Sequence, residues 1–218
     1  MKSSALNLLL LLVAFVQLFV DESECCLTNH CNRKRINDLT VHLLHPLRPQ
    51  RNQPTYAVCT VNPSNTLRSD QPAITGRVLF KQDHPTSTVE GFINLSGFLR
   101  HQSLHAIHVH KFGDLTDGCT STGPHYNPNG VNHPLHPGDF NNFATKSGKI
   151  VQSLSNLQVT LFGSRSILGR AVVVHAGEDD LGTGGNEGSL LHGNSGARLA
   201  CCTIGLSKAD LWDATVHQ

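Results

Sequence analysis

Two histidines, His108 and His110, stand one residue apart in an apolar stretch of the chain. Successive side chains of a β-strand point to opposite faces, so in a strand both imidazoles would share one face, about 7 Å apart. Two imidazoles at that spacing can chelate one metal ion, while Val109 would point into a core. Because the chain has 14 histidines, this pair alone is equally compatible with ordinary solvated or buried histidines.

Further along the chain, three imidazoles and one carboxylate recur at spacings of eight, three and three: His125, His133, His136 and Asp139. Such a closed four-coordinate set suits zinc in a structural role, and its nitrogen-rich donors fit zinc better than calcium. A second set without a carboxylate suits copper, which can cycle between two oxidation states. It comprises one histidine shared from the loop together with His108, His110 and His175. The alternative is two histidine-rich loops that serve pH sensing or solubility.

The elements that must position these residues have the pattern of short strands separated by glycine and proline. They are expected at residues 56–61, 74–80, 89–95, 104–112, 150–154, 159–161, 171–175 and 198–205. This recurrence predicts an all-β fold, a β-sandwich or Greek-key barrel. Residues 113–143 and 177–196 lack the strand pattern and are predicted to be long loops. A long loop in a compact domain is usually functional, and a metal ion and a disulfide are the expected means of holding the first one.

The composition limits the class of protein. A formal net charge of +1 over 218 residues argues against a nucleic-acid binder. Lys2 followed by a nearly unbroken apolar run, Ala5 to Val20, predicts a secretory signal peptide at residues 1–24, with an uncleaved anchor as the alternative. An N-terminal extension (25–55), a globular domain (56–206) and a short tail (207–218) follow, and Trp212 in the tail is expected to pack as an apolar anchor.

Seven cysteines in a secreted chain predict disulfides and one unpaired thiol. Spacing alone does not determine the pairing, which is left open for Cys25, Cys26, Cys31, Cys59 and Cys202. Asn94 begins an Asn-Leu-Ser sequon, so it is expected to face solvent and is a candidate for N-glycosylation.

Six motifs together are highly specific: HVHKFGD (108–114), GCTSTGPHYNP (118–128), HPGDF (136–140), GRAVVVH (169–175), DDLG with GGN (179–186) and GNSGARLAC (193–201). Through them, the chain from about Tyr56 to Gly205 resembles the copper–zinc superoxide dismutase family. The short span from His133 to His136 and the doubled Cys201-Cys202 resemble its extracellular branch. The resemblance implies an eight-stranded antiparallel Greek-key β-sandwich or barrel with two long functional loops.

The resemblance also implies a role for each site residue. The copper ligands would be His108, His110, His125 and His175. The zinc ligands would be His125, His133, His136 and Asp139, so that His125 bridges both metals. Asp179 would link a copper ligand to a zinc ligand, and Cys119 and Cys201 would form the intradomain disulfide, with a Cys59–Cys202 bridge as a further possibility. Two catalytic roles follow: Arg198 attracts and orients superoxide, and His125 carries a proton.

The implied function is that of a secreted, extracellular antioxidant enzyme, which converts superoxide to oxygen and hydrogen peroxide by alternate reduction and oxidation of copper. A homodimer or homotetramer is expected. The alternative is a dismutase-like copper-binding or copper-delivery protein without turnover. The chain departs from cytosolic relatives near Gly188 and Leu191, where an acidic residue and a lysine are absent, and at His192, where a small polar residue is common. The tail lacks the basic cluster that binds heparan sulfate in mammalian extracellular members, which argues against such binding unless Arg33–Arg35 replaces it.

Overall fold

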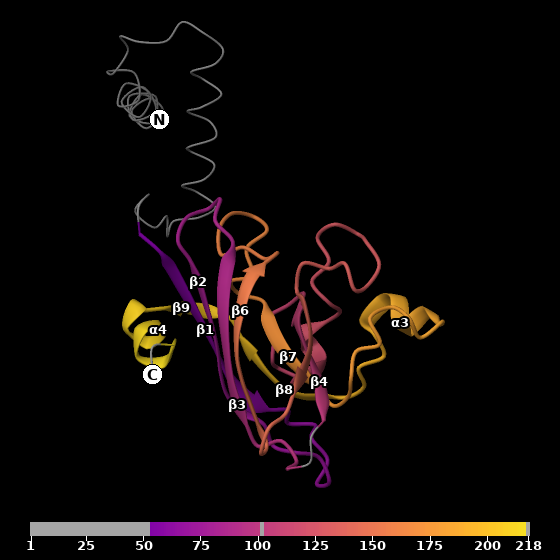
Figure 1. The fold of residues 1–218 in the computed structure, drawn as a ribbon. Helices are drawn as coiled ribbons and strands as arrows, with labels where there is room; N and C mark the ends of the chain where they lie inside the picture. The colour runs from indigo at the N-terminus through magenta and orange to yellow at the C-terminus, as the bar shows by residue number, and fades with distance from the viewer. Residues whose placement is uncertain (1–52, 101–102, 217–218) are drawn as a thin grey trace, which may run out of the picture. The chain divides into compact units, whose positions relative to one another are not determined.

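The structure is a computed structural model and describes residues 53–100 and 103–216. The predicted signal peptide and residues 25–52 of the predicted extension lie outside these residues. Most described elements are strands, as Figure 1 shows. Their bounds are β1 (Thr55–Pro63), β2 (Thr75–Gln82), β3 (Val89–Ser96), β4 (Leu104–His110), β5 (Asp139–Ala144), β6 (Lys149–Leu157), β7 (Ala171–His175), β8 (Arg198–Thr203) and β9 (Gly205–Ser207). The helices are a 3-10 turn, η1 (Thr120–Thr122), and two α-helices, α3 (Glu187–His192) and α4 (Ala209–Val216).

The strands pair in the order β5-β4-β7-β8-β1-β2-β3-β6, with β9 also paired to β1. All of these pairings are antiparallel. Because β6 pairs with β3 and β7 pairs with β4, the chain crosses between the two halves of the sheet, which is the Greek-key arrangement. The eight principal strands form a nearly closed barrel, so the predicted fold class is confirmed.

Alternation of side chains decides what fills the barrel. In β3, Val89, Ile93 and Leu95 are buried and Asn94 is exposed, as expected for the sequon. β1 buries Ala57, Cys59 and Val61 in the same way and is more open at the residues between them. Burying an aliphatic or aromatic side chain contributes about 1.5–3 kcal/mol at most, so a core of this kind stabilises the barrel. It includes Val78, Phe80, Ile93, Ile107, Val109, Val172, Val174 and Leu199.

β4 and β7 differ from the outer strands because both of their faces are buried. Ile107 and Val109 of β4 and Val174 of β7 belong to the core. Their neighbours His108 and His110 therefore lie on the outer face of the barrel, where they are nonetheless fully buried. The two long loops, which connect β4 to β5 and β7 to β8, must cover this face, so the histidines lie between the barrel and these loops.

Four sequence-based boundaries need correction. The first loop ends at Gly138, because Asp139 begins β5, whose two asparagines conceal its strand character. Residues 159–161 are not a strand, and Thr160 forms only an isolated bridge to Ser166. The second loop contains α3, and the tail contains α4.

Trp212 of α4 is buried and its ring lies 6.4 Å from that of Tyr56, which confirms the expected apolar anchor. In Figure 1, α4 and α3 lie on opposite sides of the barrel. Among the residues that the structure describes, no helix is long and apolar enough to cross a membrane.

Candidate metal centre

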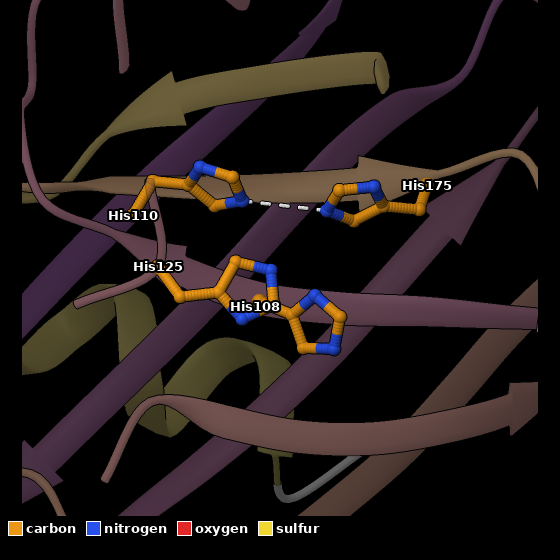
Figure 2. A group of neighbouring side chains, drawn as sticks. All are labelled: His108, His110, His125 and His175. Carbon is orange, nitrogen blue, oxygen red and sulfur yellow. Dashed lines mark hydrogen bonds between the residues drawn. The ribbon is translucent and has the colours of Figure 1, made fainter. Parts of the chain in front are cut away.

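Four buried histidines from three segments meet on the outer face of the barrel (Figure 2). β4 supplies His108 and His110, the end of β7 supplies His175, and the loop after η1 brings His125 over them. One ring nitrogen of each lies within 4.8 Å of the corresponding nitrogens of the other three. The Nε2 atoms of His110 and His175 are 3.3 Å apart, as the dashed line in Figure 2 marks. We call this group the four-histidine cluster.

Hydrogen bonds at the outer nitrogens fix the orientation of these rings. The Nδ1 atom of His110 lies 2.8 Å from the carbonyl oxygen of Gly123, and that of His175 lies 3.4 Å from the carbonyl oxygen of Gly196. Donation from Nδ1 leaves the lone pair of Nε2 directed into the cluster. His108 is reversed, because its Nε2 lies 2.8 Å from Oδ2 of Asp179, so its Nδ1 points inward.

A second cluster adjoins the first and comprises His125, His133, His136 and Asp139, again with ligand atoms within 4.8 Å of one another. Asp139 Oδ1 lies 3.0 Å from Nδ1 of His125, and Oδ2 lies 2.8 Å from Nδ1 of His133 and 3.0 Å from Nδ1 of His136. We call this group the carboxylate cluster. His125 belongs to both, with Nδ1 turned to the carboxylate cluster and Nε2 left for the four-histidine cluster.

Asp179 joins the two clusters from outside. Its Oδ2 accepts a hydrogen bond from Nε2 of His108. Its Oδ1 accepts a hydrogen bond from Nε2 of His133, and these two atoms are 2.7 Å apart. Asn142 holds Asp179 through two hydrogen bonds of 2.8 Å: its Oδ1 accepts from the backbone N–H of Asp179, and its Nδ2 donates to the carbonyl oxygen of Asp179. One buried carboxylate thereby orients a ring in each cluster.

The unpartnered atoms test whether metal ions fit. Within the described residues, four buried ring nitrogens make no hydrogen bond of good geometry: Nδ1 of His108 and Nε2 of His125, and also Nδ1 of His133 and of His136, which only lie close to Oδ2 of Asp139. A buried polar atom without a partner costs about 1–3 kcal/mol, so four in one place need an explanation. All four belong to these clusters. A metal ion in each cluster would take up these lone pairs, so the residues fit two ions bridged by His125.

Burial disfavours the charged form of three histidines of the four-histidine cluster. It lowers the pKa of His110 and of His175 well below the usual value, because the charged imidazolium loses its hydration. Burial also lowers the pKa of His125 to about 4, although the contact with Asp139 opposes that shift. Neutral imidazoles are the form that binds metals, so these ligands need little deprotonation at neutral pH.

The carboxylate cluster, in contrast, favours positive charge. Burial alone would lower the pKa of His133, but its contacts with Asp139 and Asp179 outweigh burial and raise the pKa to about 9. Burial would raise the pKa of both carboxyl groups, yet their close contacts with the histidines hold each pKa well below the usual value. Two carboxylates therefore stabilise positive charge at this position, which suits a divalent cation.

An open hollow of about 750 Å³ borders the four-histidine cluster, and His110, His125, His175 and Arg198 are among its lining residues. Arg198 of β8 is half-buried, and its Nη1 donates to the carbonyl oxygen of Cys119 (2.9 Å) and to Oγ1 of Thr122 (3.1 Å). Burial lowers the pKa of the guanidinium, which remains charged at neutral pH. A fixed positive charge thus stands beside the route to the cluster.

Two disulfides form in the described part of the chain, Cys119–Cys201 and Cys59–Cys202. The first is the pairing expected from the resemblance, and the second is the pairing that was left open. Cys119–Cys201 joins the loop that carries His125 to the strand that begins with Arg198. The disulfide therefore ties the carrier of a shared ligand to the carrier of the positive charge.

The structure brings together every residue that the sequence predicted for the metal clusters. It adds partners that residue types did not reveal, namely Asn142 and the carbonyl oxygens of Gly123 and Gly196. His105 was also missed: its Nδ1 lies 2.9 Å from the carbonyl oxygen of His175, and its Nε2 lies 2.9 Å from Oγ of Ser103. Its place in the same strand as the His-x-His pair was the one available signal.

Two adjoining clusters that share one histidine, carried on a Greek-key barrel, are the arrangement of a dinuclear metalloprotein. Comparison with known proteins gives the particular family. Residues 74–204 match the copper/zinc superoxide dismutase family, to which this chain belongs. The cofactors of that family are copper and zinc, as the donor sets predicted.

Curated relatives agree with this placement. The chain is 58% identical over 165 residues to the extracellular copper–zinc superoxide dismutase of Rattus norvegicus, covering 75% of this chain and 68% of the relative. It is 54% identical over 165 residues to that of Homo sapiens, covering 75% and 69% respectively. Identity to the copper–zinc superoxide dismutase of Schizosaccharomyces pombe is 43% over 148 residues, covering 65% of this chain and 95% of the relative.

Proposed function

We propose that this chain is a secreted copper–zinc superoxide dismutase, in which the four-histidine cluster holds copper and the carboxylate cluster holds zinc. Four imidazoles without a carboxylate suit a redox-active copper ion, and three imidazoles with one carboxylate suit zinc. The observation that carries the proposal is that the two clusters share His125 while the four-histidine cluster borders an open hollow beside Arg198. A shared ligand couples the two sites, and the hollow gives an anion access to one of them.

Bound copper would supply the one-electron chemistry that converts two superoxide anions to oxygen and hydrogen peroxide, with zinc as a structural partner. The chain's own residues supply positioning and protons. His125 presents Nε2 to the four-histidine cluster while Asp139 holds its Nδ1 side, so Nε2 is placed to carry a proton toward the reduced product. Asp179 keeps His108 and His133 in the tautomer that each cluster requires.

Arg198 is proposed to attract and orient the anion. Because its Nη1 is held by Cys119 and Thr122, the guanidinium cannot swing away from the hollow without breaking those bonds. A fixed charge at the mouth of a cleft raises the arrival rate of an oppositely charged substrate, by about 10–1,000-fold for a whole steering field. Diffusion-limited turnover is a property of superoxide dismutases as a class.

The extracellular relatives and the two disulfides support a secreted location. Assembly into homodimers or homotetramers, cleavage of residues 1–24 and glycosylation at Asn94 stay predictions. Light scattering of the secreted protein, sequencing of its N-terminus and treatment with a glycosidase would test them in turn.

The first experiment follows superoxide consumption by stopped-flow absorbance, with the protein metal-loaded, copper-stripped and as the Arg198→Gln variant. We expect fast consumption that requires copper, falls about 10-fold in the variant and decreases with added salt. Arg77→Gln is the control, because this exposed arginine lies on β2 away from the hollow. A protein that binds both metals yet consumes no superoxide would refute the proposal and favour a copper-binding or copper-delivery role.

A further inference from the structure

The hollow beside the four-histidine cluster is far larger than superoxide needs. Its volume is about 750 Å³, whereas a molecule the size of water occupies about 30 Å³. No acidic residue lines the hollow, and four of the lining residues carry a permanent positive charge: Lys111, Arg165, Arg170 and Arg198. An anion with substantial additional bulk is therefore compatible with both its size and its charge.

Another part of the hollow, formed by α3, is apolar. Leu190 and Leu191 both line the hollow, and 43% and 56% of their surfaces are exposed. Val131, 36% exposed, adds to this apolar part. Adjacent exposed aliphatic side chains that line a hollow are typical of a surface that contacts an apolar group.

These leucines are held in place. The side chain of Asn186 accepts from the backbone nitrogen of Ser189 at the start of α3, and Oγ of Ser189 donates to Oδ1 of Asp180 over 2.7 Å. The carbonyl oxygen of Leu190 accepts from the backbone nitrogen of His133 over 2.9 Å. The apolar surface is thus attached to the carboxylate cluster and does not depend on a loose loop.

Arg198 is the best placed of the basic residues to hold an anion. Arg170 stacks on Tyr126 at 3.9 Å and donates to the carbonyl oxygens of Ser166 and Lys111. All described hydrogen bonds of Arg198, in contrast, use Nη1 alone. Its Nε and Nη2 donate to no acceptor among the described residues, so they can meet a carboxylate in the paired geometry that guanidinium groups favour.

We propose that this hollow binds an aliphatic monocarboxylate, with its carboxylate at Arg198 and its hydrocarbon chain against Leu190 and Leu191. A small inorganic anion would leave the leucines uncovered, and a neutral hydrocarbon would leave the basic residues without a counter-charge. A bound carboxylate would lie across the route to the four-histidine cluster, so it would compete with superoxide. The site is one of binding and goes beyond the proposed dismutation.

Isothermal titration calorimetry of the metal-loaded protein with acetate, butyrate, hexanoate and octanoate tests the proposal. Full burial of a methylene group corresponds to about a fourfold gain in affinity, so a half-open surface should give about twofold for each. Octanoate is then expected to bind roughly 60-fold more tightly than acetate. Because every member has the same carboxylate, the slope of the series reports the hydrocarbon chain and not contacts of the head group.

Two variants separate the two ends of the site. In Leu190→Gln/Leu191→Gln, octanoate should lose most of its advantage while acetate binding stays unchanged. Arg198→Gln should weaken all four carboxylates by a similar factor. Leu99→Gln is the matched control, because that leucine is 50% exposed and does not line the hollow; it should leave the whole series unchanged.

Three results would overturn the proposal. The first is equal affinity for acetate and octanoate, which would mean a small-anion site only. The second is that affinity rises with hydrocarbon length as steeply in the double leucine variant as in the wild type, which would place the hydrocarbon chain of the ligand elsewhere. The third is that octanoate does not bind, while sedimentation shows self-association of the protein that the double leucine variant abolishes. That result would mean that the leucines contact a second copy of this chain. Calorimetry reads binding whether or not the protein turns over superoxide, so failure here is distinct from failure of the proposed enzyme.

Discussion

Asp179 is the residue on which both clusters depend, although it belongs to neither. Its two oxygens accept one hydrogen bond each from His108 and His133. In Asp179→Asn the amide keeps only one accepting oxygen, so it can no longer accept from both rings. We expect zinc affinity to fall about 10–100-fold, measured by competition with a chromogenic chelator.

The control for this substitution is Asp83→Asn, which removes a half-exposed carboxylate that pairs with Lys81. It should leave zinc affinity unchanged, because an exposed ion pair is worth little and lies far from the clusters in sequence and fold. Equal zinc affinity in wild-type protein and Asp179→Asn would contradict the linking role of Asp179.

The metal clusters were predictable at this scale because the chemistry is carried by residue types. Imidazoles at His108 and His110 share a strand face by geometry alone, and His125, His133 and Asp139 are spaced closely in one stretch of the sequence. What holds the rings was not predictable. A carbonyl oxygen such as that of Gly123 is present at every residue, so nothing in the sequence marks the one that accepts from His110.

At the scale of elements, the end of α3 is built around a glycine. Gly193 has φ 64° and its N–H donates to the carbonyl oxygen of Ser189. A Cβ at this position would overlap the carboxylate of Asp179 and lie 2.7 Å from Nε2 of His133. Gly193→Ala should therefore displace Asp179 and lower zinc affinity at least 10-fold in the chelator assay.

Gly185 provides a matched comparison, because its φ is 72° but a Cβ there would meet nothing within 4 Å. Gly185→Ala should cost only the backbone strain of a left-handed alanine, about 1 kcal/mol, with zinc affinity retained. Similar losses of zinc affinity in both variants would show that backbone strain, and not the contact with Asp179, is responsible.

The Cys119–Cys201 disulfide makes a separate prediction for the loop that carries His125. It closes 82 residues, for which the chain-entropy treatment gives about 4.5 kcal/mol. The double variant Cys119→Ser/Cys201→Ser should lose about 2–5 kcal/mol in urea unfolding. It should also weaken the salt dependence of superoxide consumption, because Cys119 holds Arg198. Lost stability with full salt dependence would confine the disulfide to a structural role.

Most strands were predictable from alternation, as β3 illustrates with Val89, Ile93 and Leu95 inward. β5 was not, because the sequence Asp-Phe-Asn-Asn-Phe-Ala has low strand propensity and is fixed by pairing with β4. Helix α3 is only six residues long and depends on its cap at Asn186 and on Asp180, contacts that lie outside any helical periodicity. Short elements of this kind are determined by tertiary contacts rather than by local preference.

At the scale of the whole molecule, the metal ligands set how stability depends on pH. The lowered pKa values of His110, His125 and His175 mean that, below the usual pKa of 6.5, the unfolded chain binds protons that the metal-free native state does not. The free energy of unfolding of the metal-free protein should therefore fall as the pH drops from about 6.5 toward 4. Bound metals favour the native state further by mass action, because the clusters do not exist in the unfolded chain.

His133 changes the pH dependence of the free energy of unfolding in the opposite direction. Its pKa is raised from 6.5 to about 9 in the folded metal-free protein, so the native state binds a proton that the unfolded chain releases. This stabilisation is complete below pH 6.5 and is lost as the pH rises through 9, by about 3 kcal/mol at most. Urea unfolding of metal-free protein should therefore show maximal stability near pH 6.5 and lower stability at both pH 5 and pH 9. With zinc bound, the metal replaces the proton at His133, so the decline toward pH 9 should disappear. A metal-free protein that becomes more stable from pH 6.5 to 9 would contradict the charge balance derived for the carboxylate cluster.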